Sequence, residues 1–137
     1  MRETILRMHV WLVATLIPLL VKFLDIPALL RLAEFPGRWH PYAGIPAETI
    51  AGIVDRRLAN PCHMRRRRCL RQGLTFFHFL HLAGIPSEIT FGALGPATPG
   101  RRMHAHCWVT VNGVAFDPPV GPVAVLFTHR YQPERSR

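Results

Sequence analysis

Proline divides the first third of the chain, which is otherwise strongly apolar. Residues 5–33 are rich in Leu, Ile, Val and Ala, with prolines at positions 18 and 27. Asp25 shortly before Pro27 is typical of a helix start, because an acidic cap and an early proline both suit a first turn. We therefore predict two helices around a kink. Residues 34–46 hold three prolines and two glycines and are expected to form a loop.

Helical spacing returns in the middle of the chain. Residues 47–58 place their apolar side chains on one face and end before Asn60-Pro61. Leu70, Leu74, Phe77 and Leu80 then recur at intervals of three and four, which predicts a second helix that Gly84 ends.

Strand patterns follow in the last third. Residues 87–92 alternate weakly and predict a strand. Asn112-Gly113 between two runs of β-branched and aromatic residues is a strong hairpin signal. We expect another strand over residues 123–127 and a polar, frayed tail from His129. Helices followed by an antiparallel sheet make an α+β fold, which we divide into apolar N-terminal helices with a loop (1–46) and a second domain (47–137).

The hairpin brings a histidine and an acid together. A two-residue turn sets Val111 opposite Val114, so that Trp108 faces Asp117. Because side chains alternate between the two faces, His106 shares a face with Asp117 while Cys107 points the other way. Diagonal neighbours of this kind lie within side-chain reach, and a carboxylate can orient an imidazole. The alternative is that both residues simply end their strands.

Cysteine usage singles out one thiol. The chain has three cysteines, Cys62, Cys69 and Cys107, so a closed disulfide framework within it is excluded and a reduced cytoplasm is expected. Cys69 stands at a predicted helix start, directly after Arg65, Arg66, Arg67 and Arg68. Helix N-termini and cations both stabilise a thiolate, which is the nucleophilic form. The alternative is that Cys69 is a small buried residue of the core.

Charge points to an anionic partner without identifying it. Lys and Arg number 17 against 8 Asp and Glu, for a formal net charge of +9. A basic nucleic-acid-binding module is one alternative, but the arginines are not interleaved with stacking aromatics, and we expect no nucleic acid. Cys62-His63 and residues 104–107 carry metal-binding side chains, yet Cys107 points away from His104 and His106. We therefore predict no metal and no cofactor.

The apolar N-terminal segment of the chain has two possible interpretations. A basic first segment followed by an uncharged run over residues 8–21 resembles a signal peptide. Glu3 and Pro18 interrupt that pattern, no cleavage site follows, and the run is shorter than the roughly 20 residues that cross a bilayer. We favour a buried or interfacial helix, and leave open a peripheral membrane contact.

Taken together, the motifs resemble a known family. A predicted helix begins at Cys69-Leu70 and ends at Gly84-Ile85-Pro86. It is followed by Ala105-His106-Cys107-Trp108-Val109 and then by Asp117-Pro118. These pieces, within residues 69–118, resemble the lasso peptide biosynthesis B2 proteins, which are stand-alone leader peptidases of the transglutaminase-like cysteine peptidase superfamily. Three features depart from the pattern: Cys107 occupies a position where alanine is common, Gly73 is a poor helix former, and the run of four arginines before Cys69 is more extreme than the pattern leads us to expect.

The resemblance implies a transglutaminase-like fold with Cys69 as nucleophile, His106 as base and Asp117 as its orienting acid. The N–H of Cys69 would contribute to an oxyanion hole. The substrate would be a precursor peptide, delivered by a leader-binding partner protein and later closed by a lasso cyclase. Another transglutaminase-like acyl transferase is the enzymatic alternative. The four arginines are read as a solvated run or as a contact for the leader or partner, and the loop over residues 94–102 as a connector or a border of the substrate cleft.

Overall fold

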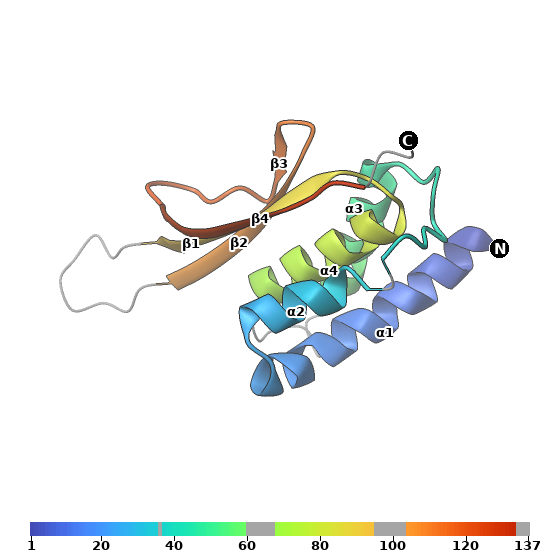
Figure 1. The fold of residues 1–137 in the computed structure, drawn as a ribbon, viewed down its shortest axis with the longest axis horizontal. Helices are drawn as coiled ribbons and strands as arrows, with labels where there is room; N and C mark the ends of the chain where they lie inside the picture. Colours follow the sequence, from blue (N-terminus) through green and yellow to red (C-terminus); the bar gives the residue numbers. More distant parts are fainter. Residues whose placement is uncertain (36, 60–67, 95–103, 134–137) are drawn as a thin grey trace.

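A computed structural model describes residues 1–35, 37–59, 68–94 and 104–133. Within them the helices are α1 (Arg2–Phe23), α2 (Ile26–Ala33), α3 (Ala47–Leu58) and α4 (Arg68–Leu82). The strands are β1 (Ser87–Leu94), β2 (His104–Val111), β3 (Val114–Phe116) and β4 (Ala124–Tyr131). Figure 1 shows the helices gathered on one side of the sheet, with α4 between the sheet and α1. The predicted α+β class is confirmed.

The sheet is antiparallel, with strand order β3-β2-β1-β4. Val111 pairs with Val114, and Thr110 with Ala115, as the hairpin signal predicted. Asn112 and Gly113 both have positive φ, of 50° and 78°. Two consecutive positive φ values define the tight turn whose twist matches that of paired strands. The sequence signal therefore determines the register of β2 and β3.

Side chains along β2 alternate between two environments. Cys107, Val109 and Val111 are buried, and α4 packs against β2 on this side. His106 and Trp108 are half-buried and occupy the opposite face. The predicted separation of His106 from Cys107 is therefore confirmed, and it decides which residues can face α4.

Helix α4 is the centre of the core. Phe77, Phe79 and Leu80 are completely buried between the sheet and the other helices. The helix ends where Gly84 adopts a φ of 69°. The Gly84 N–H bonds to the carbonyl of His81 and the Ile85 N–H to that of Leu80, each at 2.9 Å. This pair of bonds is the Schellman motif, which satisfies the last helical carbonyls and explains why glycine stops the helix here.

The N-terminal helices pack onto α4 and share its core. Helix α1 continues through Pro18, and the break falls at Leu24, after which the Asp25 side chain caps α2 by accepting from the Ala28 N–H at 2.9 Å. The buried residues of α1 and α2 form one cluster with those of α3, α4 and the sheet. Hence the core is continuous across residue 46, where the sequence suggested a boundary.

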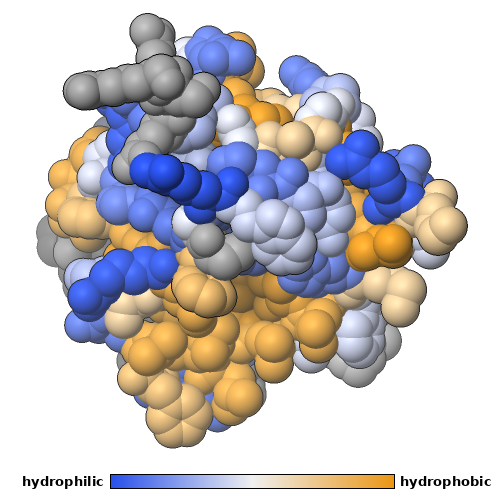
Figure 2. Space-filling view, turned by 45° about the vertical axis from the view of Figure 1, so that its right-hand side comes forward, coloured by the Kyte–Doolittle hydropathy of each residue, from blue (hydrophilic) through white to orange (hydrophobic). Residues whose placement is uncertain are grey.

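Helix α1 carries a second apolar face. Its buried residues are Leu6, Val10, Ala14 and Ile17. At about 100° per residue, the far side of the helix is also apolar, and its exposed members are Ile5, Met8, Leu12, Leu16, Leu19 and Phe23. Figure 2 shows an apolar surface in the lower part of the view, on the side where Figure 1 has α1. By length and composition alone α1 is able to cross a membrane.

The predicted frayed tail from His129 is wrong. Strand β4 extends to Tyr131, and Ser87 pairs with Tyr131 at the start of β1. His129 Nε2 lies 2.7 Å from a carboxylate oxygen of Glu34. The Tyr131 ring packs edge-on against His81, with centroids 4.4 Å apart. These contacts join residues that are distant in the sequence, so a local pattern gives no sign of them.

Candidate functional site

Cys69 lies in the first turn of α4 and is half-buried. Amide groups in the first turn of a helix point along its axis, and the helix dipole adds partial positive charge at that end. An oxyanion formed beside Cys69 would be stabilised by this arrangement. The predicted position of Cys69 at a helix start is therefore confirmed.

Cys107 faces Cys69 from the sheet. Its thiol donates a hydrogen bond to the main-chain carbonyl of Cys69 at 3.1 Å, and its side chain is 3% exposed. Burial raises the pKa of the Cys107 thiol well above its ordinary value, and negative charge on Cys69 and Asp117 acts in the same direction. Cys107 is thus held as a neutral thiol, which is not the nucleophilic form.

Gly73 makes room for this arrangement. A Cβ atom at position 73 would overlap the Cys107 sulfur, and it would lie 3.7 Å from the Ile89 Cδ1. Glycine costs roughly 1 kcal/mol in a helix relative to alanine. Its presence in α4 is explained by the close approach of β2, which carries the Cys107 sulfur to the first turn of the helix.

His106 and Asp117 meet, as predicted, but through a different group. His106 Nε2 lies 3.0 Å from the main-chain carbonyl of Asp117. A carbonyl can only accept, so Nε2 carries the proton and donates. Nδ1 is then the basic nitrogen of the neutral ring. The ring also stacks on Trp108, with centroids 6.1 Å apart and planes inclined by 23°.

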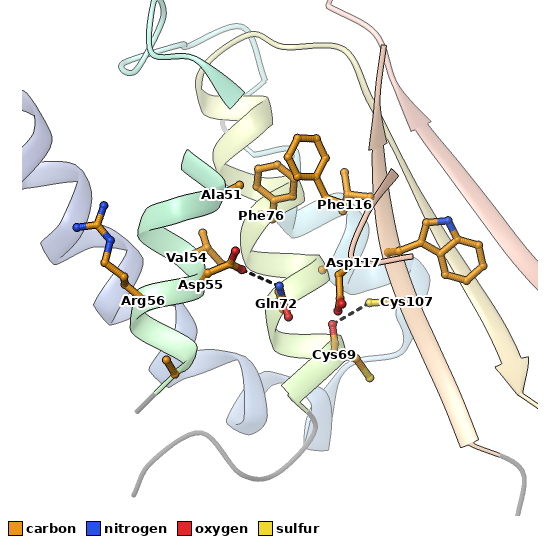
Figure 3. A pocket seen from close by; sticks show the side chains of 14 residues that line it. Ala51, Val54, Asp55, Arg56, Cys69, Gln72, Phe76, Cys107, Phe116 and Asp117 are labelled. Carbon is orange, nitrogen blue, oxygen red and sulfur yellow. Dashed lines mark hydrogen bonds between the residues drawn. The ribbon is translucent and has the colours of Figure 1, made fainter. Parts of the chain in front are cut away.

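Figure 3 shows the Asp117 side chain pointing toward the first turn of α4, where Cys69 lies. The Asp117 backbone has a φ of 55°, a conformation that non-glycine residues seldom adopt, although Asn and Asp do so most often. This departure from extended geometry ends β3 after Phe116 and interrupts the alternation of side chains on which the sequence prediction depended. Asp117 therefore presents its carbonyl to His106 and its carboxylate to the cavity described next.

One cavity joins these residues to α3. It has a volume of about 750 Å³, and its lining includes Cys69, Cys107 and Asp117 at one end and Ala51, Phe76 and Phe116 at the other. Figure 3 shows Asp117 beside the first turn of α4, and the two phenylalanine rings farther along the same opening. The structure thus brings Cys69 and Asp117 to one cavity. His106 is not among the lining residues.

Sequence reasoning missed the wall of the cavity that α3 provides. Gln72 lies one turn beyond Cys69 and donates to the Asp55 carboxylate on α3 at 2.7 Å. Asp55 and Gln72 both line the cavity. Their pairing joins two helices, and no spacing within either helix signals it.

Several predictions fall on residues outside the described ones. They concern Cys62, His63, Arg65, Arg66 and Arg67, residues 95–102 of the predicted loop, and the side chains of Arg68 and His104. Among the described residues there is no group of three or more metal-binding side chains. Two histidines of α4, His78 and His81, pack inside the fold. His81 is 1% exposed, and His78 Nδ1 bonds to the Ala33 carbonyl at 2.7 Å.

Comparison with known proteins adds the family. A model of the transglutaminase-like superfamily matches residues 11–128, which include α4, strands β1 to β3 and most of α1 and β4. Searches of the curated proteins and of the solved structures found no match. The superfamily includes cysteine peptidases and acyltransferases, and its match covers the cysteine, histidine and aspartate described above. By the extent of this match, the chain belongs to the transglutaminase-like superfamily.

Proposed function

We propose that this protein is a cysteine peptidase that removes the leader from a ribosomally made precursor peptide during lasso peptide maturation. The observation that carries the proposal is the position of Cys69, in the first turn of α4 and at one end of a cavity. In a superfamily that includes cysteine peptidases and acyltransferases, a cysteine so placed suits nucleophilic attack on a carbonyl. The resemblance of residues 69–118 to lasso leader peptidases supplies the substrate class.

The reaction proceeds in two steps. The Cys69 thiolate attacks the carbonyl carbon of the scissile amide, and the thiol proton passes to His106 Nδ1. The amide nitrogen leaves with that proton, and the leader stays on Cys69 as a thioester. Water then attacks the thioester, gives its proton to His106, and releases the leader carboxylate. The N–H of Cys69 stabilises the oxyanion in both steps.

His106 acts in this scheme with Asp117 as its positioning residue. The bond from Nε2 to the Asp117 carbonyl supports Nδ1 as the base, because it keeps the proton on the far nitrogen. For proton transfer, Nδ1 has to approach the Cys69 sulfur around the edge of β2. Strand β3 pairs with β2 only over residues 109–111, so the ladder leaves that edge uncovered at His106.

The partners follow from the same proposal. A leader-binding protein delivers the precursor, and a lasso cyclase acts on the freed peptide, all in the cytoplasm. The apolar far side of α1 is compatible with a contact to the partner or to a membrane surface. No cofactor is required, since the cysteine, the histidine and water supply every bond change.

The test incubates the protein with a lasso precursor peptide and a leader-binding protein. The wild-type protein should cut the precursor once, and the two product masses should sum to that of the precursor plus one water. Cys69→Ala should give no product while keeping the wild-type unfolding transition. Product formation by Cys69→Ala at the wild-type rate would overturn the proposal.

A superfamily acyl transferase is distinguished in the same assay. If the protein is a peptidase, addition of a primary amine should leave the main product masses unchanged, because water is the acceptor of the acyl group. An acyl transferase would instead convert the leader to its amide. Predominant amide formation at modest amine concentration would replace the peptidase with a transferase as the function of this site.

A further inference from the structure

The cavity beside Cys69 is larger than the attack on one carbonyl requires. Its volume of about 750 Å³ lies within the roughly 300–1,000 Å³ typical of sites that enclose a ligand. Cys69 and Asp117 lie at one end, and the opening continues along α4 past Gln72 to Phe76. The cavity extends about two turns of the helix from the nucleophile, since Cys69 and Phe76 are seven residues apart.

The end remote from Cys69 is apolar. Phe76 and Phe116 meet edge to face, with centroids 5.0 Å apart and planes inclined by 62°. Ala51 and Val54 of α3 complete this end. Phe76 and Val54 are 4% and 1% exposed, so the packing around them fixes their positions. Ala51 is small and half-buried, which leaves the space in front of the two rings open.

Polar side chains lie nearer to Cys69 and along α3, where the lining includes Asp117, Gln72, Asp55 and Arg56. Gln72 lies between Cys69 and Phe76 on α4, and its amide is fixed by the bond to Asp55. A carboxamide held in this way offers a hydrogen-bonding group to an extended peptide main chain, while the apolar end beyond it offers none. A peptide lying along α4 would thus have main-chain contacts near Gln72 and a side-chain site at the two rings.

We propose that the apolar end of the cavity, formed by Ala51, Val54, Phe76 and Phe116, is a subsite that binds a large apolar side chain of the substrate, close to the bond cleaved by Cys69. This inference rests on the proposed function and adds the chemical class of one substrate residue. Displacement of water from an apolar, rigid wall favours leucine or phenylalanine over alanine or a charged residue. Discrimination by such a pocket is typically about 10- to 200-fold in kcat/KM.

The test varies the substrate and the pocket together. Precursor peptides carry Ala, Leu, Phe or Glu at each of about three residues on either side of the cleaved bond, because an extended peptide needs about three residues to span two helical turns. The value of kcat/KM is measured for the wild-type protein, Ala51→Leu and Thr49→Leu. Leu at position 51 fills the space before the rings. Thr49 is exposed on the same helix and does not line the cavity, so Thr49→Leu is the matched control.

The wild-type protein should prefer Leu or Phe over Ala at one flanking position by about 10-fold or more. Ala51→Leu should lose most of that preference and keep its rate on the Ala peptide, whereas Thr49→Leu should behave as wild type. An equal loss on all peptides, or an unchanged preference in Ala51→Leu, would overturn the subsite. Absence of any Cys69-dependent cleavage by the wild-type protein would instead reject the proposed function.

If Ala51→Leu does not fold, the variant Phe116→Ala tests the same subsite. It enlarges the same end of the cavity from the hairpin side, and it should lower kcat/KM for the Leu and Phe peptides while sparing the Ala peptide. A loss that is the same for every peptide would contradict the proposal.

Discussion

Replacement of Gly73 by alanine tests the close approach of α4 and β2 that brings Cys107 to Cys69. The new methyl group would overlap the Cys107 sulfur, while Ile89 Cδ1 and the Cys107 Cβ would remain in ordinary contact at 3.7 Å. Overpacking of a dense core costs about 1–3 kcal/mol. Alanine recovers roughly 1 kcal/mol of helix propensity. Gly73→Ala should therefore lower the free energy of unfolding by up to about 2 kcal/mol.

The same change should stabilise a protein that lacks the sulfur. In Cys107→Ala the overlapping atom is gone, so that only the gain in helix propensity, about 1 kcal/mol, remains. Cys107→Ala itself should cost about 1 kcal/mol, through lost packing and the lost bond to the Cys69 carbonyl. The interaction energy between positions 73 and 107 equals the overpacking cost, about 1–3 kcal/mol.

Urea unfolding of the wild type, both single variants and the double variant gives this interaction energy directly. The four m-values have to agree for the comparison to hold. Should Gly73→Ala change the free energy of unfolding equally in both backgrounds, within about 0.5 kcal/mol, the contact between α4 and Cys107 would be refuted.

Two further outcomes are expected. Burial lowers the pKa of His78 to about 4, whereas the pKa of a histidine in an unfolded chain is roughly 6.5. Between these two pKa values the unfolded state binds more protons than the folded state, so the folded protein loses stability as the pH falls from about 6.5 toward about 4. Between about pH 7 and pH 5 this loss of stability is about 2 kcal/mol. The variant His78→Asn keeps a donor for the Ala33 carbonyl and should remove most of the loss, as measured by urea unfolding at both pH values. An unchanged pH dependence of stability in this variant would exclude His78 as its source. Asp117 has a positive φ and accepts from His106 through its main-chain carbonyl, which an asparagine at this position can also do. Asp117→Asn should therefore be as stable as the wild type, whereas Asp117→Ala should lose about 1 kcal/mol of unfolding free energy. Equal thermal stability of the two variants would show that the backbone at residue 117 is not strained.

Elements with local signals were predictable from the sequence. Asn112-Gly113 determines the β2–β3 register because few other pairs allow two positive φ values in succession. Gly84 ends α4 for the same kind of reason. The placement of Cys69 in a first turn follows from the helical spacing of the apolar residues after it.

The features that depend on distant contacts were not predictable. Asp117 presents its carbonyl to His106 because its backbone leaves the extended region, which the residue type permits without requiring. The α3 wall of the cavity and the Gln72–Asp55 bond form only when α3 and α4 pack together. Strand β4 continues past His129 because β1, Glu34 and His81 hold it, and they lie far away in the sequence.

If Cys69 is the nucleophile, the leader becomes attached to its sulfur, so identification of the acylated residue decides its role. The protein is mixed with excess precursor, quenched in acid within the first turnover to preserve the thioester, digested, and mapped by mass spectrometry. The leader should be found on Cys69. Cys107→Ala should retain the acyl group and cleavage, while Cys69→Ala should lose both. An acyl group on Cys107, or cleavage without Cys69, would show that Cys69 is not the nucleophile.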